Sequence, residues 1–267
     1  MLARSTLGSV EGAPVTGPST ITVSSAVRSY DGSQRCGDVA CVLPLSSGRT
    51  AIVVVDVAGY GADRAPLSWA LAKTITASLQ RDGCPAVALS CADRLLRASS
   101  DESPYAVAFV ALVHPVLRTV VYASAGHDVA FVLAQDGRIR HLAPTAAMLG
   151  IPLTNHACDA AFVLAPSDTV VIVTDGVSDS RPAGSAEFFG ATGTARAVTR
   201  SLSYGADPAR AVLEAACAHE GGCQADDIAV LVARLRPWRP GRSADRQCQP
   251  RSIRYDDVLP TKLVSCL

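Results

Sequence analysis

Aromatic side chains are scarce in this 267-residue chain, at 5% of residues, so large rings cannot supply most of its core. The hydrophobic fraction is nevertheless 49%, which is enough apolar material for one substantial core. The chain lacks any run of about 18 apolar residues, and its first 20 residues lack the apolar stretch of a signal peptide. We therefore expect a cytoplasmic protein that does not span or bind a membrane.

An excess of charge of either sign is also missing, because 24 Lys and Arg residues balance 24 Asp and Glu residues. Bulk electrostatics therefore give no attraction to nucleic acid, and no nucleic-acid partner is expected. Basic residues gather only around residues 234–254, where prolines interrupt them and no aromatic row accompanies them. That pattern favours a solvated tail over a nucleic-acid patch.

The nine cysteines include no Cys-x-x-Cys pair, and their number is odd. This excludes a disulfide framework and argues against a thiolate zinc site. We expect most of these cysteines to be small buried apolar residues in a reducing cytoplasm.

Apolar periodicity separates the chain into runs of strands and runs of helices. The expected strands are 20–26, 39–45, 50–55, 107–113, 119–123, 129–133, 170–173 and 228–235. The expected helices are 65–80, 85–99, 194–202 and 208–219, the last with Asp207 as N-cap and Pro208 at its first position. This order favours an α+β fold of antiparallel sheets packed together with helices outside. We expect one folded domain at 21–235, a flexible lead at 1–20 and a mostly disordered tail at 236–267.

The first two expected helices carry apolar stripes. Leu67, Leu71, Ile75 and Leu79 form one stripe, and Val87, Cys91, Leu95 and Leu96 form the other. The first stripe is either part of the core or a surface offered to a partner or to a second copy in a homodimer.

Four aspartates stand in turns or at the ends of expected strands: Asp38, Asp56, Asp175 and Asp226. A single Asp in such a place is usually a turn former or a helix cap. A carboxylate at the end of a buried strand, however, is costly to desolvate without a positive partner. Hard oxygen ligands suit Mg²⁺ or Mn²⁺, so a shared metal site is the alternative interpretation.

Short words around these aspartates resemble one known family. Val55-Asp56-Val57-Ala58-Gly59-Tyr60-Gly61 resembles the D-V-S-G-H-G motif of the PPM family of metal-dependent protein phosphatases. Four further motifs resemble those of the family's bacterial sporulation stage II protein E and stress-response branch. Cys36-Gly37-Asp38 resembles G-G-D, and Ala123 to His127 resembles N-A-G-H. Thr174 to Asp179 resembles T-D-G-V-T-E, and Asp226-Asp227-Ile228 resembles D-D-I-T. The resemblance implies a PPM-type β-sandwich of two antiparallel sheets flanked by helices.

The resemblance also implies roles for individual residues and two divalent metal ions, Mn²⁺ or Mg²⁺. Asp56 would bridge both metals, the carbonyl of Val57 would bind the second, and Asp175 and Asp226 would complete the first. Asp38 would bind directly or through water, so Asp56 and Asp38 are the expected catalytic carboxylates. Activated water would attack phosphorus in line without a protein nucleophile, while the metals neutralise the developing charge.

Three further residues are candidates for the layer around the metals: Asp227, His127 and Tyr60. His127 lies in a matching word, although a hydrogen-bonded packing role is favoured over a catalytic one. Tyr60 stands where the branch has His, Ala229 replaces its Thr, and Asp38 continues into Val39-Ala40-Cys41 instead of F-Y-D.

The function implied is dephosphorylation of phosphoserine or phosphothreonine on a regulatory protein in bacterial stress or sigma-factor signalling. In the resembled branch such substrates include anti-sigma-factor antagonist domains. One alternative is an inactive pseudophosphatase that binds a phosphoprotein. Another is a metal-dependent hydrolase of small phosphate esters, which would need a closed pocket.

Overall fold

The structure, a computed structural model, describes residues 20–33, 35–59, 61–99, 105–151, 157–222 and 224–236. Nearly all of the expected lead and tail lies outside these ranges, as does Tyr60.

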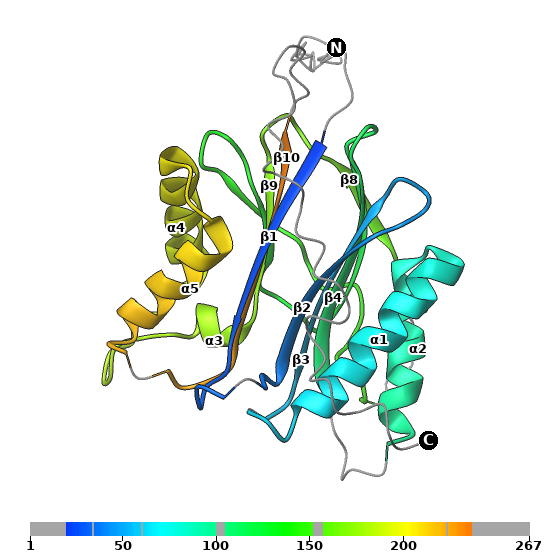
Figure 1. Cartoon of the computed structure of the whole chain (residues 1–267), viewed down its shortest axis with the longest axis horizontal. Coiled ribbons are helices and arrows are strands. Elements are labelled where there is room, and N and C mark those ends of the chain that lie inside the picture. Colours follow the sequence, from blue (N-terminus) through cyan, green and yellow to red (C-terminus); the bar gives the residue numbers. More distant parts are fainter. Residues whose placement is uncertain are drawn as a thin grey trace, which may run out of the picture. The chain divides into compact units, whose positions relative to one another are not determined.

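Two five-stranded sheets, antiparallel throughout, form the centre of the domain (Figure 1). In spatial order, the first sheet consists of β1 (Thr20–Arg28), β10 (Ile228–Arg236), β9 (Thr169–Val173), β6 (Ala130–Leu133) and β7 (Ile139–His141). The second consists of β2 (Asp38–Pro44), β3 (Thr50–Val57), β4 (Ala106–His114), β5 (Thr119–Ala125) and β8 (Ala160–Val163). The predicted sandwich of two antiparallel sheets is confirmed.

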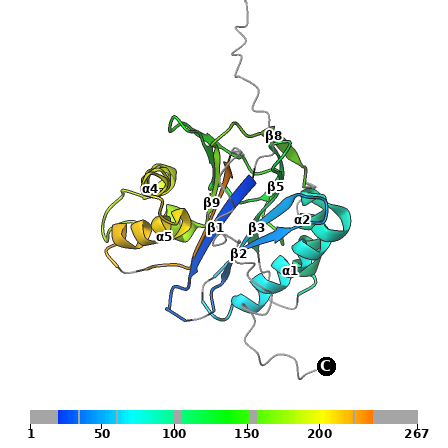
Figure 2. The same ribbon diagram turned by 45° about the horizontal axis from the view of Figure 1, so that its top comes forward.

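Helices cover the outer face of each sheet, so both faces of the central strands are buried (Figures 1 and 2). The helices α1 (Ala65–Asp82) and α2 (Pro85–Arg97) pack on the second sheet, and α4 (Gly190–Tyr204) and α5 (Pro208–His219) pack on the first. A single turn, α3 (Asp175–Ser178), follows β9. None of the described helices is long and apolar enough to cross a membrane.

Strand β3 shows how side-chain alternation builds the two cores. Val53 and Val55 point to the cluster beneath α1 and α2, whereas Ile52 and Val54 point into the layer between the sheets. All four are fully buried. Successive side chains in a strand face opposite sides, so a strand covered on both faces reads as an unbroken apolar run. Small Val and Ala side chains suit such thin layers, which explains a core built with few rings.

The helix boundaries follow local signals. Asp207 caps α5, and its carboxylate accepts a 3.0 Å bond from the backbone N–H of Arg210, as expected from the sequence. Helix α1 ends at Gly83, which adopts the left-handed conformation (φ 61°). Helix α2 has no cap on its own N-terminus. Instead Asp159 accepts a 2.7 Å bond there from the N–H of Ala86.

Four sequence expectations need correction. The strands β7 and β8 and the turn α3 were missed, because each has three or four residues and is too short to show a period. The apolar stripe assigned to α2 was right at Leu96, which is fully buried, and wrong at its other large aliphatic positions. Val87 and Leu95 are exposed, and the buried face is instead formed by Pro85, Ala88, Leu89, Ala92 and Leu96. Small alanines on that face concealed it from a search for large apolar residues.

The cysteine expectation was wrong in part. The six described cysteines (Cys36, Cys41, Cys84, Cys91, Cys158 and Cys217) are free, as predicted, but none of them is fully buried. Cys158 is exposed and the other five are half-buried.

The stripe on α1 belongs to the core. Leu71 and Ile75 are fully buried against the second sheet, Leu79 is buried with them, and Leu67 is half-buried at the edge. The alternative, that this stripe is offered to a partner, is therefore not supported by its placement.

We predict that Leu71→Ala lowers the free energy of unfolding by about 2–5 kcal/mol, because it leaves a cavity between α1 and the second sheet. Chemical denaturation of the metal-free protein measures the change. Trp69→Ala on the same helix is the matched control, because Trp69 is 39% exposed, and it should cost clearly less. Equal losses in the two variants would contradict the buried position of Leu71.

Candidate metal centre

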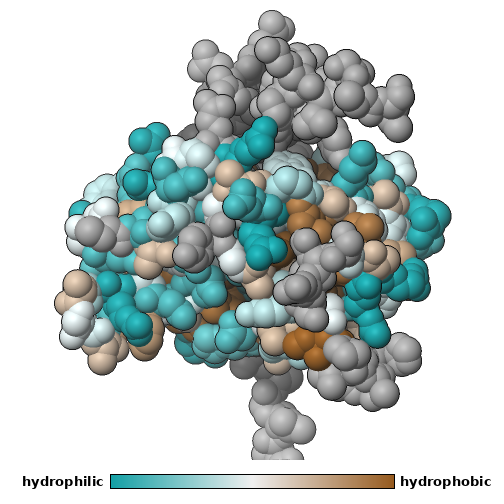
Figure 3. Space-filling model, turned by 90° about the horizontal axis from the view of Figure 1, so that it is seen from below, coloured by the Kyte–Doolittle hydropathy of each residue, from teal (hydrophilic) through white to brown (hydrophobic). Residues whose placement is uncertain are grey.

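The four aspartates lie at one end of the sandwich. Asp38 is the first residue of β2 and is the register partner of Asp56, near the end of β3. In the other sheet, Asp175 lies two residues after the end of β9, and Asp226 lies two residues before the start of β10. Because neighbouring strands are antiparallel, the start of one lies beside the end of the next. The strand ends that carry the four acids therefore lie at one end of the sandwich, where β2 starts and β3 ends in Figure 1; Figure 3 looks at the molecule from that side, where the visible coloured surface is a mixture of hydrophilic and apolar residues.

The Asp38 and Asp56 carboxyls are crowded and poorly solvated. Asp38 is only 5% exposed, and its Oδ2 is buried without a hydrogen-bond partner. Burial, followed by repulsion from Asp56, raises the pKa of Asp38 well above its usual range. Burial and the charges of Asp175 and Asp226 raise the pKa of Asp56 to about 7, although a hydrogen bond with Asp38 offsets part of the effect. Like charges directly opposite in a sheet are destabilising, so this pair is not there for stability.

The pKa values of the two acids next to the other sheet, Asp175 and Asp226, are also raised by burial and by neighbouring carboxylates. Burial raises the pKa of Asp226 to about 6, with further contributions from Asp175 and Asp227. Asp175 is exposed as a residue, but partial desolvation of its carboxyl, followed by the charge of Asp179, raises its pKa. Since the charges of Asp175 and Asp226 both act on Asp56, the fold brings together the acids from the two sheets.

Backbone contacts hold the two strand ends of the first sheet together. The N–H of Ala229 donates a 2.9 Å bond to Oγ1 of Thr174, and the N–H of Thr174 donates to the carbonyl of Ala229. Gly176 lies so close that an added Cβ would be 1.9 Å from the carbonyl oxygen of Asp227. Only glycine permits this approach, which keeps Asp175 next to Asp226.

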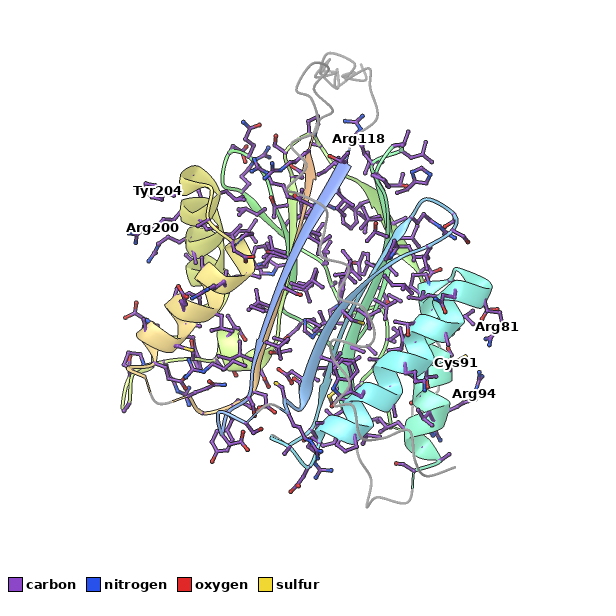
Figure 4. The ribbon with its side chains drawn as sticks, viewed as in Figure 1. Arg81, Cys91, Arg94, Arg118, Arg200 and Tyr204 are labelled. Carbon is purple, nitrogen blue, oxygen red and sulfur yellow. The ribbon has the colours of Figure 1, made fainter. Side chains whose placement is uncertain are left out.

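The main causes of these pKa shifts are burial and other carboxylates, and no cationic side chain ranks among them. In Figure 4, Arg81 and Arg94 lie on the outer side of α1 and α2, Arg200 lies on α4, and Arg118 lies at the opposite end. The carboxylates therefore act mainly on one another, and a bound cation would relieve this repulsion.

The fit to a metal ion rests on the donors. Within the ranges that the structure describes, no three acidic, imidazole or thiol groups form a ready-made metal cage. The donor set is nevertheless all oxygen, as Mg²⁺ and Mn²⁺ prefer, and the orphaned Oδ2 of Asp38 has a buried lone pair with nothing to bind. The residues therefore fit hard divalent cations, which would draw the carboxylates inward and relieve their repulsion.

The other candidate residues take different places. Val57 is fully buried and ends β3, one residue after Asp56. His127 is buried against Phe109 at 6.2 Å between ring centroids, and burial lowers its pKa to about 4, so it stays neutral. Its Nε2 has no hydrogen-bond partner, although hydrogen bonding with backbone groups of Val129 and Val173 offsets part of the lowering of its pKa. The packing role of His127 stays a prediction. Asp227 is 2% exposed and binds backbone amides.

One acid near the site was missed by the sequence analysis. The charge of Asp128 also raises the pKa of Asp175, although Asp128 lies in the loop between β5 and β6. Its position directly after His127, in a word already singled out, was the available signal.

Comparison with known proteins agrees with this geometry. Residues 46–236 match the model of the family described as stage II sporulation protein E. No curated protein sequence is significantly similar to the chain.

Several solved structures share the fold. The RsbU and RsbW domains of a Mycobacterium tuberculosis protein superpose with a TM-score of 0.69 at 21% identity, over 84% of this chain and 62% of that one. The PP2C phosphatase domain of SpoIIE from Bacillus subtilis, with a fragment of its regulatory domain, gives 0.70 at 16% identity, over 80% and 63%. The SiaA-PP2C domain of Pseudomonas aeruginosa gives 0.67 at 23% identity, over 79% and 85%. The chain thus spans less than two thirds of the first two structures, and these likenesses concern the fold. With most of its length matched by the family model, the chain belongs to the stage II sporulation protein E family.

Proposed function

We propose that this protein is a metal-dependent phosphatase that removes phosphate from serine or threonine of a regulatory protein. The observation that carries the proposal is the pair of buried Asp38 and half-buried Asp56, placed opposite each other in strand register, with Oδ2 of Asp38 unpartnered. Such a pair is costly to the fold unless a cation occupies the site. Membership of a phosphatase family supports the same conclusion.

The chain's own residues would bind and position the ions. Asp56 is the proposed bridge, because carboxylates from both sheets act on it. Asp38, Asp175 and Asp226 would complete the ligands, together with the carbonyl of Val57. When bound, Mn²⁺ or Mg²⁺ would supply Lewis-acid polarisation of the phosphate and neutralise charge that develops on its oxygens. A structure titled as RsbX in complex with magnesium shares this fold, which supports a divalent cation here.

A protein substrate is proposed because Asp175 is exposed at the acid cluster, where a phosphorylated side chain can approach. Two cavities among the described residues lie along α4, and the larger, about 580 Å³, lies between α4 and α5. None of the four aspartates lines either cavity. An acid cluster on an open end can receive a phosphorylated side chain carried by a folded partner.

The proposed partner is a phosphorylated signalling protein of the anti-sigma-factor antagonist kind. This rests on similar structures whose titles name RsbU with RsbW domains and the cell-fate determinant SpoIIE. A homodimer and a cytoplasmic location stay predictions. Because the α1 stripe is buried, a homodimer would have to use another surface.

The first prediction concerns activity. Hydrolysis of an aryl phosphate and of a phosphoserine protein should stop in excess chelator and return with Mn²⁺ or Mg²⁺. Asp175→Asn should lower kcat/KM by at least about 100-fold, since it removes a ligand charge, and it should leave the melting curve cooperative. Asp136→Asn, in an exposed hairpin, is the control and should retain normal rates. Mn²⁺ binding without turnover would favour the pseudophosphatase, and full activity in chelator would exclude the proposal.

The second prediction concerns the stability of the metal-free protein against pH. The pKa of Asp56 is about 7 when folded and near 4 when unfolded, so between these values the folded state holds the extra proton. The stabilising effect is present at low pH and is lost as pH rises through about 7. Asp226, with a pKa of about 6, acts in the same direction.

With chelator present, Asp56→Asn should therefore raise the free energy of unfolding by roughly 1–2 kcal/mol at pH 8 and have a smaller effect at pH 5. Denaturation at both pH values measures the difference. Added Mn²⁺ should stabilise the wild type more at pH 8 than at pH 5.5, because protons compete with the ion. If Asp56→Asn destabilises the metal-free protein at pH 8, the carboxylates are not crowded as described.

A further inference from the structure

Asp227 differs from its neighbour Asp226 in what its carboxylate contacts. It is 2% exposed, and both of its oxygens accept backbone hydrogen bonds. Oδ1 accepts from the N–H of Tyr30 at 2.8 Å, whereas Oδ2 accepts from the N–H of Gly37 at 2.8 Å and of Gly61 at 2.7 Å. A buried carboxylate held by three amides is already satisfied, so it needs no metal ion.

The three amides come from three different segments beside the acid cluster. Tyr30 lies in the turn after β1, Gly37 directly precedes Asp38, and Gly61 lies five residues after Asp56. Asp227 itself stands at the start of β10, in the other sheet. One side chain therefore ties the start of β2 and the loop after β3 to the strand end that carries Asp226.

The peptide of Gly37 is held from both sides. Its N–H donates to Asp227, and its carbonyl accepts a hydrogen bond from Oγ of Ser68, a fully buried residue of α1. A Cβ at position 37 would lie 2.6 Å from Oδ2 of Asp227 and 3.3 Å from Cβ of Arg64. Since no side chain fits there, Gly37 allows Asp227 and α1 to close on the residue before Asp38.

We propose that Asp227 is a positioning residue, which acts with Ser68 through the Gly37 peptide to set Asp38 and the loop after Asp56 at the spacing that a metal ion requires. This rests on the proposed function but assigns Asp227 no contact with metal or substrate. The three backbone N–H groups point at both oxygens of the Asp227 carboxylate, so both oxygens must accept hydrogen bonds. An asparagine amide would turn an NH₂ group toward at least one of these N–H groups.

The test compares Asp227→Asn with the wild type by calorimetric titration of Mn²⁺ and by phosphatase assays over a range of Mn²⁺ concentrations. We expect the Mn²⁺ dissociation constant to rise about 10–100-fold, with kcat largely recovered at saturating Mn²⁺. Asp31→Asn is the matched control, because Asp31 lies in the same turn as Tyr30 and its carboxylate accepts hydrogen bonds from Ser29 and Ser33 within that turn. It should bind Mn²⁺ as the wild type does.

The outcomes separate the alternatives. A lower melting temperature with unchanged Mn²⁺ affinity would mean a purely structural role, and it would overturn the proposal. A kcat that stays low at saturating Mn²⁺ would place Asp227 in the reaction itself and would also overturn it. If the wild type binds Mn²⁺ but has no phosphatase activity, the proposed function fails while the affinity comparison still decides the role of Asp227.

A second variant covers the case in which Asp227→Asn does not fold. Ser68→Ala removes the hydroxyl that binds the carbonyl of Gly37 and leaves in place the three backbone amides that bind Asp227. We expect it to raise the Mn²⁺ dissociation constant several-fold. Unchanged affinity in folded Ser68→Ala protein would overturn the proposal.

Discussion

Crowding of carboxylates at one end of two packed sheets is the constraint on which the rest of this structure depends. The β2–β3 register sets Asp38 against Asp56, and the antiparallel pairing of β9 with β10 brings Asp175 and Asp226 to the same end. This arrangement costs electrostatic free energy, which the apolar layers behind it must offset. Burial and mutual repulsion raise the pKa values of these carboxyls, so without ions they hold protons more tightly than usual.

The two sheets can hold the crowded carboxylates in place because each sheet is packed on both of its faces. In β3, alternate valines reach two separate cores, so the end of the strand that carries Asp56 cannot shift without disturbing both. In β9, Val171 and Ile172 divide between the two sides in the same way. The acids therefore sit on strand ends whose positions are set by packing, and flexible loops play a smaller part.

Glycine and backbone contacts, more than side-chain pairs, adjust the fine spacing at the site. Gly37 and Gly176 each lie against Asp227, one against its carboxylate and the other against its carbonyl. Adjacent aspartates thus divide two tasks, since Asp226 faces the acid cluster and Asp227 faces the backbone around it. Structures at 16–23% identity share this fold, which agrees with a framework that depends on alternation and small residues more than on particular large side chains.

The sequence by itself predicted the order of the longer strands and helices and a fold of packed antiparallel sheets. It also singled out the four aspartates as candidate metal ligands. Apolar runs such as 50–55 and the Asp207–Pro208 helix start are local signals, and motif words depend only on neighbours in the chain. Short elements such as β8 and α3 escaped, because four residues cannot display a period. The buried face of α2 escaped because it is made of alanines. Only the tertiary structure decided that Asp38 faces Asp56, that His127 is buried against Phe109, and that Asp227 holds three amides. Strand register and hydrogen bonds to backbone amides far apart in the sequence cannot be predicted from residue types. These contacts form only when both sheets and α1 have packed.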